Sequence, residues 1–203
     1  AKRVVEQARK QGIVDQRLHS FESKLLSLGE NTPRADPSQE SLDSLLKHYR
    51  EGRYGDAEKL ALSLTQNFTQ HPFGWKVLGS VQKQTGRLNE ALKANRKVVQ
   101  LAPLDAAAHN NLANTLQELG KLEESETSFN QAIALNPDFA LAHNNLGITL
   151  HSMLRLDEAE SSFRKAIAIK PDFFEAYNNL GNLLQESGRL KEAEVSYKKT
   201  IEL

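Results

Sequence analysis

The 203-residue chain contains no cysteine, which excludes a disulfide framework, a thiolate zinc site and a cysteine nucleophile. Neither sign of charge dominates, because 26 Lys and Arg residues balance 26 Asp and Glu residues. This neutrality disfavours nucleic acid and acidic membranes as main partners, since both require clustered positive charge. Long apolar runs are also missing: no stretch approaches the roughly 20 apolar residues of a membrane span, and no apolar signal region follows Ala1. We therefore expect a cytoplasmic protein without a membrane span.

Proline and glycine are scarce, at 6 and 11 residues, but they recur at regular intervals. Gly52, Gly86, Gly120 and Gly188 keep a period of 34 residues, and Leu154 fills the slot where a glycine is missing. Three other slots keep the same phase: Pro103, Pro137 and Pro171; Ala57, Ala91, Ser125, Ala159 and Ala193; Leu78, Leu112, Leu146 and Leu180. This agreement along most of the chain indicates a tandem repeat.

Within each repeat the apolar spacing is helical. Leu112, Leu116 and Leu119 lie on one face of a helix, and a second amphipathic segment follows Gly120. The glycine is typical of a left-handed residue that ends a helix, and the proline ends the second segment. Each unit is therefore predicted to be a helical hairpin, and hairpins must stack because one alone cannot bury its apolar face.

Acidic residues are expected to cap several first helices. Capping boxes are predicted at Asp36 with Gln39 and at Asp172 with Glu175. Asp105 and Asp138 are predicted to be simple caps. We also expect Gly147 to let two helices come close together, with large side chains such as Phe163 filling the space beside it.

The repeat resembles the tetratricopeptide repeat. In residues 72–105 its pattern appears as Trp75, Leu78-Gly79, Gly86, Ala91 and Pro103, and it recurs in 174–203 from Tyr177 to Tyr197. The resemblance, over residues 38–203, implies an all-α, right-handed solenoid of five helical hairpins. The apolar spacing of residues 1–37 predicts an extra N-terminal helical segment and linker. The units are 38–71, 72–105, 106–139, 140–173 and a truncated 174–203.

The two ends of the sequence differ from the repeat. Residues 1–37 contain short apolar stripes such as Val4, Val5 and Ala8, which favour a helix that caps the first hairpin over an independent binding element. Leu203 falls inside the second helix of the fifth unit, where a bare solenoid end is a solubility liability. We expect the chain to be part of a longer protein.

Signs of catalysis are missing from the sequence. It has no glycine-rich phosphate loop, and no two of its six histidines have the close spacing of a zinc pair. His109 and His143 are 34 residues apart, so we expect them to pack between hairpins rather than act as ligands or bases. No catalytic residue, metal or cofactor is predicted for this chain.

The first helix of each hairpin is expected to line a concave groove, where side chains recur with the period of the repeat. An asparagine amide matches the N–H and C=O of a peptide unit, so a ladder of amides is suited to an extended backbone. The candidate binding residues are Asn111, Asn145 and Asn179; Asn110, Asn144 and Asn178; Asn114 and Asn182; Gln117, His151 and Gln185; and Lys76. Alternatively, these asparagines bond the backbone of neighbouring hairpins or are ordinary repeat residues.

Two comparisons within the family narrow the function. The chaperone-binding clamp of Lys, Asn, Asn, Lys and Arg is matched only by Lys76 and Asn111, which disfavours that role. The run of asparagines from Asn111 to Asn179 is similar to the repeat region of O-linked N-acetylglucosamine transferase and its bacterial relatives, which implies binding of extended protein substrates. The leading hypothesis is a scaffold that binds a protein or peptide in the groove. The alternatives are the substrate-recognition arm of a larger transferase, and self-association through exposed repeat ends.

Charge is distributed unevenly between two neighbouring units. Residues 72–105 carry six basic and two acidic residues, a net charge of +4, whereas residues 106–139 carry one basic and five acidic residues, a net charge of −4. Such opposite neighbours either stabilise the stack or orient a partner. A solvated outer surface is favoured for Lys93, Arg96 and Lys97.

Overall fold

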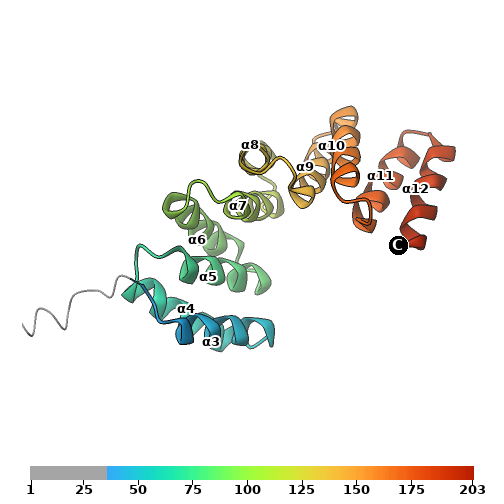
Figure 1. The fold of residues 1–203 in the computed structure, drawn as a ribbon. Helices are drawn as coiled ribbons and strands as arrows, with labels where there is room; N and C mark the ends of the chain where they lie inside the picture. The colour runs from blue at the N-terminus through green and yellow to red at the C-terminus, as the bar shows by residue number, and fades with distance from the viewer. Residues whose placement is uncertain (1–35) are drawn as a thin grey trace, which may run out of the picture. The chain divides into compact units, whose positions relative to one another are not determined.

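The computed structural model describes residues 36–203, which form ten α-helices and no strand (Figure 1). None of these helices is long and apolar enough to cross a membrane. The helices are α3 (Gln39–Arg50), α4 (Tyr54–Asn67), α5 (Pro72–Gln84), α6 (Leu88–Leu101), α7 (Ala106–Glu118), α8 (Leu122–Leu135), α9 (Ala140–Ser152), α10 (Leu156–Ile169), α11 (Phe174–Glu186) and α12 (Leu190–Glu202).

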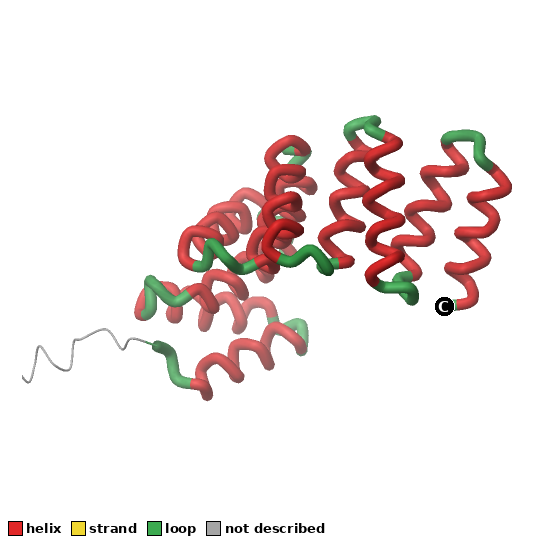
Figure 2. Tube along the Cα trace, turned by 45° about the horizontal axis from the view of Figure 1, so that its top comes forward, coloured by secondary structure: helices red, strands yellow, loops and turns green. Residues whose placement is uncertain are grey.

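Successive helices pair into five hairpins, from α3 with α4 to α11 with α12. The second helix of each hairpin then packs against the first helix of the next, and short turns join them (Figure 2). The described part of the chain is therefore the predicted all-α solenoid of five hairpins. The extra N-terminal segment predicted in residues 1–37 lies outside the described residues, apart from its last two.

Each hairpin turn contains one residue with a left-handed backbone. The φ angles are 70° at Gly52, 75° at Gly86, 71° at Gly120 and 74° at Gly188. Leu154 adopts the same conformation, with a φ of 62°. The prediction of a left-handed turn at this slot is confirmed, and in the fourth unit the conformation carries the steric cost of a side chain.

Helix capping follows the prediction at α7 and differs from it at α3. The carboxylate of Asp105 accepts a hydrogen bond from the Ala108 N–H at 3.1 Å, as expected for a cap. At α3 the capping residue is Ser38, whose hydroxyl accepts from the Ser41 N–H at 3.3 Å. The predicted box at Asp36 is wrong, because Pro37 and Ser38 still separate Asp36 from the first helical residue.

The caps predicted at Asp138 and Asp172 are also wrong. The residues that immediately precede α9 and α11 are Phe139 and Phe173, and neither helix has a side-chain cap. The aspartates lie one residue too early, and their main-chain carbonyls accept instead, from Ala140 N–H at 3.0 Å and from the equivalent N–H of α11 at 3.1 Å.

Glycines inside the first helices seat large side chains of the second helices. A Cβ atom added at Gly147 would lie 2.5 Å from Cε1 of Phe163, and one at Gly181 would lie 2.7 Å from Cε1 of Tyr197. The expected close approach at Gly147 is therefore between a glycine and an aromatic ring, and not between two backbones. This contact limits how closely the two helices of the fourth and fifth hairpins approach each other.

Ion pairs that the sequence analysis did not identify connect successive hairpins. Arg87 binds the two carboxylate oxygens of Glu58, 29 residues earlier, at 2.7 and 2.8 Å. The same spacing joins Arg155 to Glu126 at 2.6 Å and Arg189 to Glu160 at 2.7 Å. The hydrogen bond from Arg87 lowers the pKa of the Glu58 carboxyl, and this effect outweighs the opposing effect of burial.

The oppositely charged second and third units also pair with each other. Arg96 lies 2.8 Å from Glu124, and Lys83 lies 2.8 Å from Glu118. Both pairs are largely exposed, so each contributes at most about 1 kcal/mol. The charge asymmetry thus stabilises the stack, which was one of the two interpretations of the sequence.

Candidate functional site

Three cavities along the first helices contain most of the candidate asparagines. The upstream cavity, of about 160 Å³, is lined by Tyr49, Gly79, Ser80, Lys83, Gln84, Asn95, Asn111 and Asn114. The central cavity, of about 520 Å³, is lined by Leu141, Asn144, Asn145, Ile148, Phe173, Phe174, Glu175, Asn178, Asn179 and Thr200. The downstream cavity, of about 430 Å³, is lined by Ile148, His151, Phe163, Asn179, Asn182, Gln185 and Glu186.

Four asparagine side chains form a hydrogen-bonded chain across three units. Asn179 Nδ2 donates to Asn144 Oδ1 at 3.0 Å, and Asn144 Nδ2 donates to Asn145 Oδ1 at 3.2 Å. Asn145 Nδ2 in turn donates to Asn114 Oδ1 at 3.0 Å. We call these four residues the amide chain. It joins the wall of the upstream cavity to that of the central cavity, and Asn179 belongs to both the central and the downstream cavities.

The amide chain uses only part of the hydrogen-bonding capacity of its members. A neutral amide has two N–H donors and two lone pairs on its oxygen. Asn145 therefore keeps one donor and one lone pair, while Asn179 keeps one donor and both lone pairs. Asn144 is only 4% exposed, so its role is to hold its neighbours in place. Asn145 and Asn179 therefore offer a ligand fewer free hydrogen-bond donors and acceptors than predicted, but their side chains are held in fixed orientations.

Three other candidates do not line these cavities. Lys76 forms an ion pair with Asp105, the residue that caps α7. Asn110 is buried, and its Oδ1 has no hydrogen-bond partner in the described part of the chain. Gln117 is half-buried. These positions share the repeat phase of the groove residues but differ in their surroundings.

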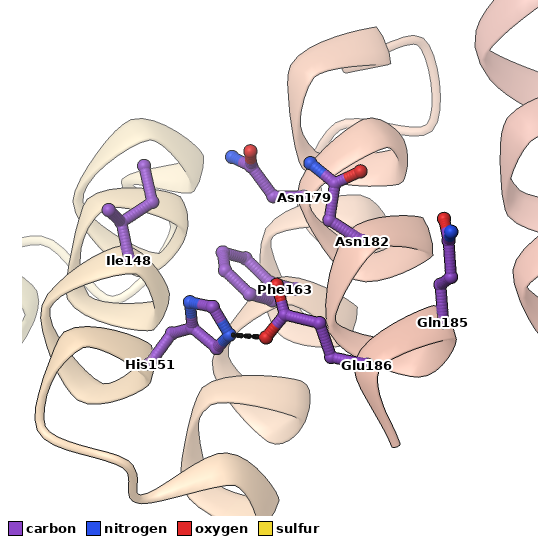
Figure 3. A pocket seen from close by; sticks show the side chains of 7 residues that line it. All are labelled: Ile148, His151, Phe163, Asn179, Asn182, Gln185 and Glu186. Carbon is purple, nitrogen blue, oxygen red and sulfur yellow. Dashed lines mark hydrogen bonds and ion pairs between the residues drawn. The ribbon is translucent and has the colours of Figure 1, made fainter. Parts of the chain in front are cut away.

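The downstream cavity is mostly polar (Figure 3). His151 Nε2 and Glu186 Oε2 lie 2.7 Å apart on one side of it, and Asn179 and Asn182 face Ile148 across it. The Tyr197 hydroxyl lies 2.8 Å from Asn182 Oδ1 and 2.7 Å from the Gln185 Oε1 atom. Internal partners therefore restrain His151, Asn182 and Gln185, and each amide keeps both of its N–H donors.

The histidines His109 and His143 have structural partners. Their Nε2–H groups donate to the carbonyl oxygens of Pro103 at 2.9 Å and Pro137 at 3.0 Å, at the end of the preceding unit. Each ring therefore links consecutive hairpins, as expected from the period of 34 residues. Within residues 36–203, no group of three or more histidine or acidic side chains is arranged to hold a metal ion.

Six residues of the central cavity were not predicted, among them Leu141, Ile148, Phe174 and Glu175. Their signal in the sequence is a departure from the residues that other units have in the same slot. A search for positions that repeat overlooks such departures.

Two models of the tetratricopeptide repeat match the chain, over residues 104–172 and 162–195. No curated protein matches it. A crystal structure of MamA superposes with a TM-score of 0.70 at 27% identity, over 77% of this chain and 91% of that one. A thermophilic tetratricopeptide repeat protein of Thermus thermophilus, TTC0263, gives 0.67 at 26% identity, over 81% and 90%.

A third solved structure is YrrB, described as a tetratricopeptide repeat protein with an unusual peptide-binding site. Its TM-score is 0.67 at 18% identity, over 88% of this chain and 90% of that one, and it supports the fold alone. The matches give no support to the narrower similarity to O-linked N-acetylglucosamine transferase. They agree with the period, the left-handed turns and the stacked hairpins: residues 104–195 match the tetratricopeptide repeat family, and the described part of the chain has the fold of tetratricopeptide repeat proteins.

Proposed function

We propose that the cavities along α7, α9 and α11 form one groove that binds an extended segment of a partner protein, and that this chain catalyses nothing itself. Tetratricopeptide repeat proteins generally mediate protein–protein interactions, which supports this class of function. The extended conformation of the ligand and the role of the asparagines are inferred from the geometry of the groove.

The observation that carries the proposal is the position of Asn111, Asn145 and Asn179. Each is half-buried, each lines a cavity, and they recur on three consecutive first helices. Asn111 lines the upstream cavity, and its side chain makes no internal hydrogen bond among the described residues. Each asparagine thus offers donor and acceptor groups to a peptide backbone, whose own N–H and C=O groups need partners when they leave water.

Affinity in such a groove must come from several asparagine side chains together. One hydrogen bond contributes about 1 kcal/mol net, and association has to offset a larger loss of translational and rotational freedom. The internal bonds of Asn145 and Asn179 reduce this cost, because the side chains are already held before the ligand arrives. A short peptide that reaches a single cavity should therefore bind weakly.

The test is a selection from a random 12-residue peptide library on the immobilised full chain. Recovered peptides are then measured by fluorescence anisotropy against the triple variant Asn111→Ala, Asn145→Ala and Asn179→Ala. Losing three bonds of about 1 kcal/mol each should weaken binding roughly a hundredfold. The matched control replaces three exposed asparagines of second helices, Asn67, Asn89 and Asn130, by alanine and should bind normally. Unchanged affinity in the groove variant would contradict the proposal.

Self-association is a second candidate role, favoured by the outer face of α12. Leu190 and Ile201 line one hollow of this helix together with Tyr197, and both are exposed, Ile201 to 85%. We propose that a second copy of the chain covers this face. Sedimentation should then show a concentration-dependent dimer that Ile201→Lys abolishes, whereas a monomer at all concentrations would remove this role.

A further inference from the structure

The central cavity has the most apolar wall of the three cavities, and neither Lys nor Arg lines it. We propose that it is a specificity pocket, which takes a bulky apolar side chain of the bound segment while Glu175 pairs with a neighbouring Lys or Arg of the same segment. This inference rests on the proposed binding of an extended segment. It specifies which class of peptide sequence the groove selects.

Three apolar residues of the pocket depart from the repeat. Leu141 stands where the preceding unit has Ala107, and Phe174 stands where the two preceding units have Ala106 and Ala140. Ile148 interrupts the ladder at the slot that Asn114 and Asn182 occupy in the flanking units. The repeat itself does not require these side chains, since neighbouring units fold with small or polar residues there. Yet all three line one cavity.

Two of these apolar side chains are unusually exposed. Leu141 is 43% exposed and Phe174 is 49% exposed, whereas large apolar side chains inside the hairpins are almost completely buried. These two residues thus contribute little to the core but place apolar surface at the mouth of a cavity of about 520 Å³. Concave apolar surface beside fixed polar groups is typical of a binding anchor.

The pocket and the amide chain share part of one cavity wall. Asn145 and Asn179 line the same cavity as Leu141 and Phe174. A backbone held by the spare amide groups therefore passes beside the pocket, and alternate side chains of an extended segment point toward the same face. One such side chain enters between α9 and α11, next to Ile148.

The wall of the pocket also carries negative charge. The central and downstream cavities are lined by Glu175 and Glu186 and by no Lys or Arg. Glu186 pairs with His151, whereas Glu175 makes no ion pair among the described residues. An acidic segment is disfavoured beside this wall. A basic residue next to the apolar anchor gains a partner, which mainly improves specificity and the rate of association.

The test uses substitutions that other units already tolerate. The pocket variant combines Leu141→Ala, Ile148→Asn and Phe174→Ala, each copying the residue of another unit in the same slot. Leu62→Ala is the control, because Leu62 is exposed to a similar extent, 41%, on the second helix α4. Circular dichroism should show that both variants keep the helical fold.

The random 12-residue library is selected on the unmodified chain, and enriched peptides are measured against both variants. We expect the enriched peptides to contain Phe, Leu, Ile or Met, with Lys or Arg within two positions of that residue. The pocket variant should bind these peptides ten- to a hundredfold more weakly, as expected for one lost large apolar contact. Glu175→Lys should reverse the preference for basic residues. Leu62→Ala should leave affinity unchanged.

The outcomes separate this inference from the proposed function. Peptides that need Asn111, Asn145 and Asn179 but bind the pocket variant normally would overturn the pocket and leave groove binding intact. Enrichment of acidic segments without an apolar anchor would overturn it as well. Failure to recover any peptide that depends on either set of residues would overturn both proposals.

Discussion

Asn145 and Asn114, 31 residues apart in consecutive units, are joined by a hydrogen bond of 3.0 Å between their side chains. The bond makes the groove wall continuous from α7 to α9, and Asn144 extends it to α11 through Asn179. The asparagines therefore contribute to the stack as well as to the groove. Because of this dual role, a substitution in the amide chain is expected to affect both the stability of the stack and the binding of a peptide.

Asn144→Ala should reduce both stability and peptide affinity, although Asn144 is nearly inaccessible. The substitution leaves Asn179 Nδ2 and Asn145 Oδ1 without their partners, at a cost of about 1–3 kcal/mol in the free energy of unfolding. Urea unfolding and peptide anisotropy measure the two effects. Asn178→Ala is the control, because this neighbouring side chain is exposed and should affect stability little. Equal stability of the two variants would mean that the amide chain does not link the units.

Leu154→Gly should stabilise the protein by up to about 1 kcal/mol. Leu154 has a φ of 62° and its side chain is exposed, so glycine relieves the backbone cost without removing a core contact. The reciprocal change, Gly188→Leu at the equivalent turn, should destabilise by a similar amount. Both are measured by urea unfolding. A loss of stability in Leu154→Gly would show that the leucine side chain matters more than its backbone conformation.

Gly147→Ala should destabilise by about 1–3 kcal/mol, because its Cβ would lie 2.5 Å from the buried Phe163 ring. Gly55→Ala, inside α4 with no atom within 4 Å of the added Cβ, should instead be neutral or stabilising by up to about 1 kcal/mol. Thermal unfolding of the two variants measures their stabilities, and so compares the cost of displacing the Phe163 ring with the gain in helix propensity. Similar effects of both substitutions would contradict the assigned role of Gly147.

Acid should weaken the contact between the first two hairpins. The pKa of Glu58 is lowered by its hydrogen bond with Arg87, so the folded state holds the charged form more strongly than the unfolded chain does. The resulting stability is fully present above the unfolded-state pKa of about 4.3, and it is lost as the pH falls through the lower folded-state value. Glu58→Gln should therefore be less stable than the unmodified chain at neutral pH, and the difference should vanish in strong acid.

Urea unfolding across this pH range checks the prediction. Glu123→Gln is the control, because Glu123 is exposed and makes no ion pair within residues 36–203. A difference between Glu58→Gln and the unmodified chain that persists unchanged in strong acid would mean that the substitution acts through packing and not through charge.

Much of the fold was predictable because the repeat imposes the same geometry five times. The glycine slot predicted the left-handed turns, and Leu154, the one exception in that slot, adopts the same conformation. The caps at Asp138 and Asp172 were predicted wrongly, because residue type alone does not fix on which residue a helix begins. The ion pair of Arg87 with Glu58 was missed, since its spacing of 29 residues is shorter than the repeat and spans two hairpins.

The candidate site was predictable only in outline. The repeat phase identified Asn145 and Asn179 as groove residues, but it treated Asn110 and Asn144 as equivalent. In the structure Asn144 Oδ1 accepts a bond from the next unit, whereas Asn110 Oδ1 has none among the described residues. Such differences arise from neighbouring side chains, which a periodic pattern averages out. The apolar pocket at Phe174 was overlooked for the same reason.

The most direct test of groove binding follows the side-chain amide resonances of the asparagines by nuclear magnetic resonance during titration with a selected peptide. The signals of Asn111, Asn145 and Asn179 should shift, with those of Asn67 and Asn130 on the second helices unchanged. Shifts confined to Asn67 and Asn130, with the three groove amides unaffected by a bound peptide, would contradict the account.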